Sequence, residues 1–302
     1  QVIVSKYGDH LPLYRLERIF GRHKIEIARS TLCDWTRQSA EALGPLYDVM
    51  VRDVLGSKVI HTDDTPVDVQ APGLGKTRTG RFWVYVGDEA HGQVVFDYTP
   101  SRERDGPMAF LKDWGKEQPR FLQADAFGGY DGIYDGQAGG TVTEVACWAH
   151  ARRKFYDAQQ SDPGNSTQAL AYIRLLYDVE TRAKKQFGAQ KQDDDSRPLA
   201  AIRLELRQEH AAPRLEEIKT WLEGLPISAG GTVLPKSPMG QAVTYAQNQW
   251  EALKVYATDG DLNIDNNPAE NAVRRIALGR KNWLFAGSDR GGHRQPPAGQ
   301  PL

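Results

Sequence analysis

The feature that most constrains the fold is a change in the spacing of apolar residues at position 57. Residues 9–56 repeat apolar side chains at helical intervals, whereas the three runs that follow alternate with a period of two. These runs are SKVIHTDDTPVDV, GRFWVYVGDE and GQVVFDYTP, and glycine-containing turns separate them, which is typical of consecutive strands. A helix over DGPMAFLKDWG and two further strands over PRFLQADAFGGY and TVTEVACW are expected next. This order predicts an α/β fold with a mixed five-stranded sheet and helices against it.

Helical sequence surrounds the predicted sheet. In residues 1–56, a helix, a break at Gly21 and a second helix capped by Ser30 fit either a helix-turn-helix or a helical hairpin that packs on the next domain. Residues 70–80 are predicted to form a glycine-rich basic loop, without the spacing of a phosphate-binding loop. The predicted divisions are a helical segment (1–56), the first part of the core (57–156), a helical insertion (157–258), the remainder of the core (259–292) and a disordered tail (293–302).

Composition excludes several classes of protein. The formal net charge is -1, so the chain as a whole has no field that attracts nucleic acid, and any basic surface must be local. The two cysteines, Cys33 and Cys147, are too few for a disulfide framework and fit a reducing cytoplasm. No apolar run reaches the length that spans a membrane.

Three acids from separate predicted elements could form a metal site. Asp63 lies on the first strand, Asp125 at the end of the fourth, and Glu270 in the first turn of a late helix. If the first and fourth strands are neighbours, both aspartates reach one edge of the sheet. Clustered carboxylates raise one another's pKa, and a divalent cation such as Mg²⁺ or Mn²⁺ relieves that cost. Two such ions would suit phosphoryl transfer.

Each acid also has an ordinary structural explanation. Asp64 would point to the opposite face of the same strand, so an error of one residue in register exchanges it with Asp63. Asp125 stands close to two glycines, as turn-forming aspartates often do. Glu270 in a first helical turn interacts favourably with the helix dipole without any metal. Spacing alone leaves these explanations open.

Longer motifs add a resemblance to a known family. The stretches HTDDTPVDVQAPGLGKTRTGRFWVYVGDE, LQADAFGGYDGIY, EVACWAHARRKFYDA and IDNNPAENAVRRIALGRKNWLFAGSDRGG together resemble the bacterial transposases of the insertion sequence 66 family. KYGDHLPLYRLERIF and RSTLCDW resemble the helical segment that precedes the catalytic core in that family. The motifs keep the family's order over residues 4–292. The resemblance implies a ribonuclease H-like fold.

The resemblance also implies a DNA transposase with a DDE metal triad. The triad carries over to Asp63, Asp125 and Glu270, which selects Asp63 over Asp64. Two Mg²⁺ or Mn²⁺ ions would serve cleavage by water at the element's ends and then transfer of the 3′-hydroxyl strand into target DNA. The candidates for DNA contact are Arg152, Arg153, Arg274, Arg275, Arg280, Lys281 and Trp283, with core packing as the alternative for the tryptophan.

Cys147 and His150 have the C-x-x-H spacing of half a zinc site, but no second pair of ligands stands near them in the sequence. Related DDE transposases carry a similar element after the second aspartate. The resemblance therefore implies that the pair orders the edge of the active site or the DNA. A buried Cys-Trp pair at a strand end is the alternative.

The partners implied by the resemblance are the element's ends and target DNA, further copies of the chain assembled on that DNA, and helper proteins of the same element. The implied location is the nucleoid in a bacterial cytoplasm. Two other hypotheses remain: a catalytically inactive DNA-binding remnant, and a ribonuclease H-like nuclease that cuts without joining. The start at Gln1 suggests a missing N-terminal part, and the change of composition after Gly292 suggests a frameshifted or truncated copy.

Overall fold

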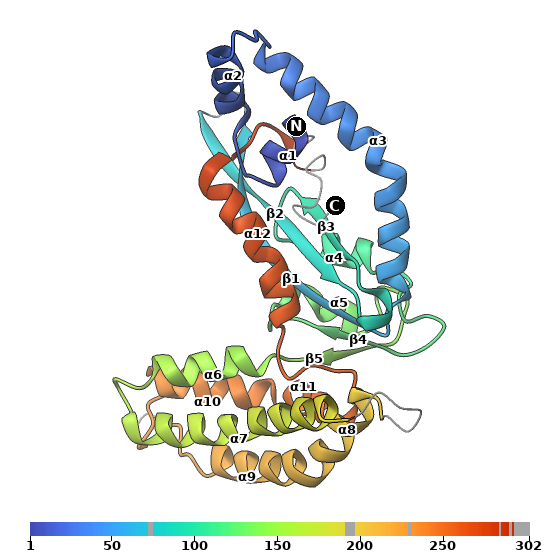
Figure 1. Ribbon diagram of the computed structural model, residues 1–302. Coiled ribbons are helices and arrows are strands. Elements are labelled where there is room, and N and C mark those ends of the chain that lie inside the picture. Colours follow the sequence, from blue (N-terminus) through green and yellow to red (C-terminus); the bar gives the residue numbers. More distant parts are fainter. Residues whose placement is uncertain (72–74, 191–196, 229–230, 284, 290–291, 293–302) are drawn as a thin grey trace. The chain divides into compact units, whose positions relative to one another are not determined.

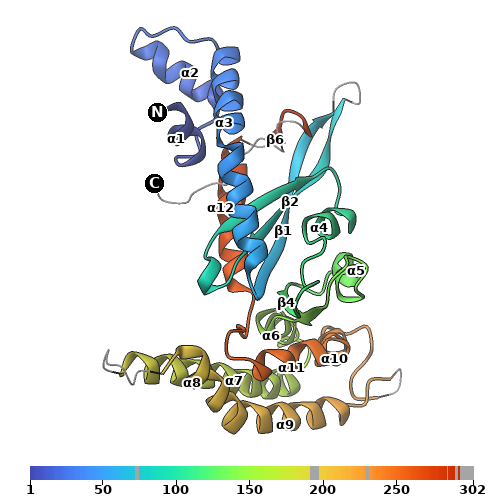
Figure 2. The same ribbon diagram turned by 90° about the vertical axis from the view of Figure 1, so that its right-hand side faces the viewer.

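A computed structural model describes residues 1–71, 75–190, 197–228, 231–283, 285–289 and 292. The side chains of Trp283 and Phe285 lie outside the described part, as does the tail 293–302 that was predicted to be disordered. The chain forms two compact units (Figures 1 and 2). The first comprises Gln1–Arg120, Phe127–Val142 and the chain from Asn267, and the second comprises Phe121–Ala126 and Thr143–Asn266. None of the described helices is long and apolar enough to cross a membrane.

The prediction of a mixed sheet with flanking helices is confirmed. The strand order is β3-β2-β1-β4-β5, and a short additional strand, β6, pairs with β1. The strands are β1 (Val59–Ala71), β2 (Lys76–Val86), β3 (Val94–Thr99), β4 (Arg120–Gln123), β5 (Val142–Val145) and β6 (Phe285–Ala286). In the first unit β1, β2 and β3 pair antiparallel, whereas β6 runs parallel to β1. The sixth strand was not predicted, because two residues carry no alternation that a sequence pattern can reveal.

The loop predicted over residues 70–80 was wrong at both ends. The ladder between β1 and β2 continues as far as Ala71 opposite Lys76, so most of the basic stretch is a strand. Thr77 and Thr79 favour the extended backbone, and each residue of the hairpin adds a pair to a ladder that is already formed. Residues 72–75 separate the two strands, and residues 72–74 lie outside the described part.

Three helices begin the first unit: α1 (Val2–Tyr7), α2 (Leu13–Arg22) and α3 (Arg29–Gly56). Val2, Leu16 and Leu32, one from each helix, form their small apolar core. The predicted cap of α3 at Ser30 was wrong, because the helix begins at Arg29. The Glu17 carboxylate accepts the Arg29 backbone N–H at 3.1 Å and pairs with its guanidinium at 2.8 Å. A side chain from the preceding helix therefore satisfies a backbone donor that a local cap would otherwise take.

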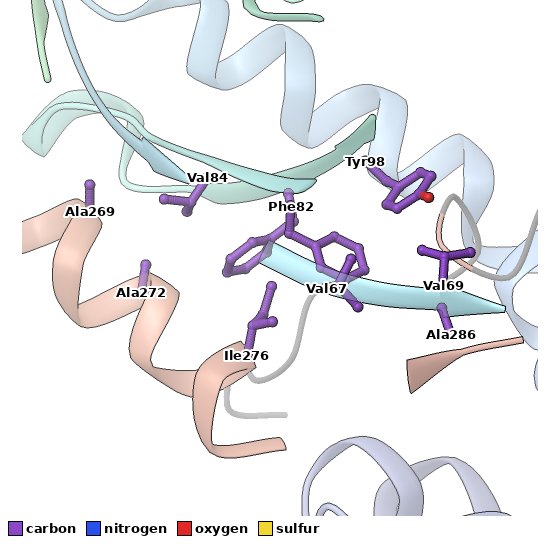
Figure 3. Packing of buried hydrophobic residues seen from close by; sticks show 10 residues of the cluster. Val67, Val69, Phe82, Val84, Tyr98, Ala269, Ala272, Ile276 and Ala286 are labelled. Atoms are coloured by element: carbon purple, nitrogen blue, oxygen red, sulfur yellow. The ribbon is translucent and has the colours of Figure 1, made fainter. Parts of the chain in front are cut away.

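The two faces of the first unit's sheet are covered by different elements. One face packs against α12 (Asn267–Trp283), whose Ala269, Ala272 and Ile276 join Val67 and Val84 in a buried cluster (Figure 3). The other face carries the aromatic rings of β2. Those rings meet α4 (Asp105–Phe110) and the short turn η2 (Gly128–Tyr130), which continues into α5 (Asp131–Tyr134). Tyr85 stacks on Phe110, and Trp83 meets Tyr130 edge-on.

The second unit is mostly helical. Its elements after β5 are α6 (Trp148–Asp157), α7 (Pro163–Gly188), α8 (Leu199–Leu206), the π-helical turn η3 (Arg207–Ala211), α9 (Ala212–Glu223), α10 (Pro238–Asn248), α11 (Trp250–Val255) and η4 (Tyr256–Thr258). Helices α6, α7, α9 and α10 pack against one another as a bundle. Asp162 and Ser237 cap α7 and α10 through side-chain hydrogen bonds, each just before a proline in the first turn.

Candidate active site

Asp63 lies in the middle of β1, on the face that α12 covers. Side chains two residues apart share a face of a strand, so Asp63 lies on the same side as Val67. Directly across the ladder from Asp63 is Val84, a member of the same buried cluster. The Asp63 side chain is half-buried, and its Oδ1 accepts the backbone N–H of Asp64 at 2.8 Å. This contact with its own strand limits the orientations of the carboxylate.

Asp64 points to the opposite face of β1 and has a structural role. Its carboxylate accepts hydrogen bonds from Arg81 and Arg102, each at 2.8 Å, and its side chain is only 2% exposed. The Arg102 guanidinium in turn lies 3.9 Å from the centroid of the Phe127 ring. These contacts tie β1, β2 and the segment after β3 together, and they occupy the carboxylate fully as a structural anion.

The Asp64→Asn substitution should therefore affect stability. An amide replaces the charge that two arginines bind, so we expect the free energy of unfolding to fall by about 2 kcal/mol. Urea denaturation followed by tryptophan fluorescence measures the change, because Trp83 lies on this face of the sheet beside Arg81. A loss no larger than that of Asp68→Asn, an exposed aspartate on the same strand, would contradict this structural role.

Glu270 is in the first turn of α12. The helix begins at Asn267, and Pro268 follows in the first turn, where its fixed backbone angle favours a helical start. Ala269 is fully buried and lies beside Val84, the residue opposite Asp63 (Figure 3). Glu270 is half-buried and borders that apolar stripe. The first unit thus brings Asp63 and Glu270 to the same side of its sheet.

Asp125 belongs to the second unit, two residues beyond the end of β4. The backbone N–H of Ala124 reaches the Val145 carbonyl of β5 at 3.4 Å, and Asp125 is half-buried. Burial raises the pKa of the Tyr245 phenol above its ordinary value, and electrostatic interaction with Cys147, Asp125 and Glu144 raises it further. Asp125 therefore lies in an acidic part of the second unit.

The C-x-x-H pair lies at the start of α6. Cys147 is buried at the N-cap position, and His150 is in the first turn. The Cys147 sulfur accepts the backbone N–H of Asn266 at 3.2 Å, and the neighbouring Trp148 donates its indole N–H to the Leu253 carbonyl at 2.9 Å. Within the second unit the cysteine thus binds the chain that leads to Glu270, and a buried Cys-Trp pair is present as well.

The cations that were predicted to contact DNA fall into two groups. Arg152 and Arg153 on α6 are exposed, as are Arg274, Arg275 and Lys281 on α12. Arg280 is half-buried instead, and it donates to the Thr65 hydroxyl at 3.0 Å and to the Pro66 carbonyl. Arg280 stands four residues after the buried Ile276, so the two share a face of the helix, and this spacing could have predicted that Arg280 points toward the sheet.

Comparison with known proteins shows the family. A family model described as "Transposase IS66 family" matches residues 1–294. The chain belongs to the IS66 transposase family. Two curated relatives are the uncharacterized proteins y4hP and y4qI of Sinorhizobium fredii (strain NBRC 101917 / NGR234), which are 30% and 31% identical to this chain over 97% and 96% of its length. The chain covers 53% and 52% of these relatives, about half of each.

Membership of the IS66 family points to a transposase of the DDE type, and such enzymes generally use divalent metal ions. Asp63 and Glu270 offer carboxylate oxygens beside an apolar cluster, and both side chains are half-buried. Hard oxygen donors with restricted water access suit Mg²⁺ or Mn²⁺. Asp125 offers a donor of the same kind and burial, so the residues fit the metal.

Proposed function

We propose that this chain carries the catalytic activity of an IS66 transposase, which cleaves DNA at the ends of an insertion sequence and transfers the strand into target DNA. One observation carries the proposal: a chain that matches the family over residues 1–294 has Asp63 and Glu270 on the same side of its sheet. We propose a ribonuclease H-like fold for the core on the same ground.

In this proposal Asp63, Asp125 and Glu270 hold two Mg²⁺ or Mn²⁺ ions. When bound, such ions lower the pKa of an attacking oxygen and offset the charge on a departing one. The chain's own contribution is orientation. Asp63 is fixed by the β1 backbone, which donates the Asp64 N–H to it, and Glu270 is fixed by a helix that buries Ala269 on the sheet. Rigid strands and helices hold carboxylates within the narrow tolerance that phosphoryl transfer requires.

The exposed cations would bind the DNA backbone. Arg274 and Arg275 follow Glu270 by about one turn of the same helix, so phosphates near the scissile bond lie within their reach. Arg152 and Arg153 would contribute from α6 of the second unit. Assembly of several copies on DNA, helper proteins of the same element and a nucleoid location belong to the same proposal.

The double substitution Arg274→Gln/Arg275→Gln tests this assignment. Loss of two phosphate contacts should weaken binding to every DNA sequence and reduce the magnitude of the slope of log affinity against log salt by about 2. Fluorescence anisotropy with a labelled duplex at several salt concentrations measures both effects. The matched control is Arg214→Gln, an exposed arginine of α9 that pairs with Glu217 and should leave the slope unchanged. An unchanged slope in the double variant would remove both arginines from the DNA interface.

A joining assay separates the proposed activity from its alternatives. The protein is incubated with labelled element ends, Mg²⁺ and a target plasmid. We expect labelled plasmid, the product of strand transfer. Nicked ends without joined product would indicate a nuclease, and bound DNA without any product would indicate a DNA-binding remnant.

A further inference from the structure

The eleven residues before α12 are held within the second unit by several hydrogen bonds from side chains and backbone. We call residues 256–266 the lead-in segment; Glu270 follows it by four positions. The carbonyls of Tyr256, Asp259 and Leu262 accept hydrogen bonds from Arg207, at 2.7, 2.8 and 2.9 Å. All three acceptors thus belong to one short piece of chain, the piece that delivers the glutamate.

Arg207 uses every donor of its guanidinium. The side chain is 0% exposed, and two of its five N–H groups bind both oxygens of Glu180, at 2.7 and 2.8 Å. The remaining three N–H groups bind the lead-in segment, and the guanidinium carbon lies 5.0 Å from the centroid of the Tyr256 ring. An arginine has five donors in a planar fork, whereas a lysine has three, so only arginine satisfies this set.

The second half of the lead-in segment is bound to β4 and to the start of α6. The Gln123 amide donates to the Asn263 carbonyl at 2.8 Å, and the Trp148 backbone N–H donates to the Ile264 carbonyl at 3.1 Å. The Asn266 N–H donates to the Cys147 sulfur. Gln123 is two residues before Asp125. The same segment is therefore bound next to one proposed metal ligand and continues directly into the helix of another.

We propose that Arg207 and Gln123 are positioning residues, which hold the lead-in segment and thereby fix the start of the helix that carries Glu270, one of the proposed metal ligands. The inference rests on the proposed function. The second unit then contains a buried ion pair because the pair fixes the arginine that binds three carbonyls of the lead-in segment. A pair that served only the bundle would need none of these carbonyls.

The substitution Gln123→Met tests positioning with little disturbance. Methionine has nearly the same length, and the Gln123 Oε1 accepts no hydrogen bond from the residues that the structure describes, so only the donor to Asn263 is lost. We expect the Mn²⁺ dissociation constant, measured by calorimetry on the protein alone, to rise by about tenfold. The Mg²⁺ concentration for half-maximal DNA cleavage should rise by the same factor. Amide exchange in residues 262–270 should become about tenfold faster.

The matched control is Gln247→Met. The Gln247 amide also donates to a backbone carbonyl, that of Leu222 at 3.0 Å in the same unit, and this acceptor belongs to α9 rather than to the lead-in segment. We expect its metal affinity and its exchange in residues 262–270 to match the unmodified protein. Arg207→Lys keeps the charge and loses two hydrogen-bond donors. In a folded Arg207→Lys protein, the Mn²⁺ dissociation constant and the amide exchange rate in residues 262–270 should therefore rise more than in Gln123→Met.

Failure of the positioning role and failure of the proposed function give different results. Unchanged metal affinity and unchanged exchange in Gln123→Met would overturn the positioning role, whatever the protein does to DNA. Absence of DNA cleavage in the unmodified protein would overturn the proposed function instead. In that case the Mn²⁺ affinity and the exchange rates still decide whether these residues position Glu270. If Arg207→Lys fails to fold, as circular dichroism would show, the Gln123→Met result stands by itself.

Discussion

Asp63→Asn should lower the rates of DNA cleavage and strand transfer by at least about 10³-fold, because the ions it would help to hold contribute several kcal/mol of charge stabilisation and each 1.36 kcal/mol is tenfold in rate. The asparagine has the shape of the aspartate, and its Oδ1 can still accept the Asp64 N–H. We therefore expect the fold and the DNA affinity to remain. Initial rates on labelled element ends in Mg²⁺, with anisotropy for binding, measure the two quantities separately.

The control for this substitution is on the same strand. Asp68→Asn removes the same charge from an exposed position on the opposite face of β1, opposite Thr79 of β2. Its cleavage rate should equal that of the unmodified protein. A cleaving Asp63→Asn protein would refute the metal-binding role of Asp63. An equal loss in Asp68→Asn would show that net charge matters and position does not.

Arg207→Met should destabilise the second unit more than any surface substitution. Glu180 would remain buried without its bidentate partner, and removal of one member of a buried pair typically costs about 3–5 kcal/mol. The carbonyls of Tyr256, Asp259 and Leu262 would lose their donor as well. Urea denaturation followed by far-ultraviolet circular dichroism reports this loss, because the second unit is mostly helical.

A second substitution separates the two parts of that loss. In Arg207→Met/Glu180→Leu no buried carboxylate is left unpaired, so we expect the destabilisation to fall to about 2 kcal/mol. That remainder reflects the unsatisfied carbonyls and the loss of the ion pair between Glu180 and Arg203 at 3.6 Å. Arg214→Met is the control, since the exposed Arg214–Glu217 pair should contribute less than about 1 kcal/mol. If Arg207→Met cost no more than this control, Arg207 would not hold the lead-in segment.

Much of the first unit follows from local patterns in the sequence. The alternation that predicts β1 also assigns its faces: Val67 and Val69 share Asp63's side, and the exposed Asp68 and Gln70 share Asp64's side. The same reasoning applies to α12, where Ala269, Ala272 and Ile276 form one apolar stripe. These patterns are local, so a single chain is enough to reveal them.

Contacts between residues far apart in the sequence cannot be predicted from such local patterns. Glu17 takes the place of the predicted cap at Ser30 across twelve residues, and Arg207 finds Glu180 across twenty-seven. Glu17 and Arg207 each lie in a helical stretch with other charged residues, and no pattern in the neighbouring sequence distinguishes them as the ones that bind a distant partner. Their partners are set by how helices pack, which depends on the whole unit.

Anomalous diffraction at the manganese edge, from crystals of the protein with a bound element end and Mn²⁺, tests the central claim most directly. We predict manganese peaks within about 2 Å of carboxylate oxygens from Asp63, Asp125 and Glu270, and loss of those peaks in Asp63→Asn. Manganese bound at other residues, or a fully formed complex in which one of the three carboxylates binds no ion, would contradict it.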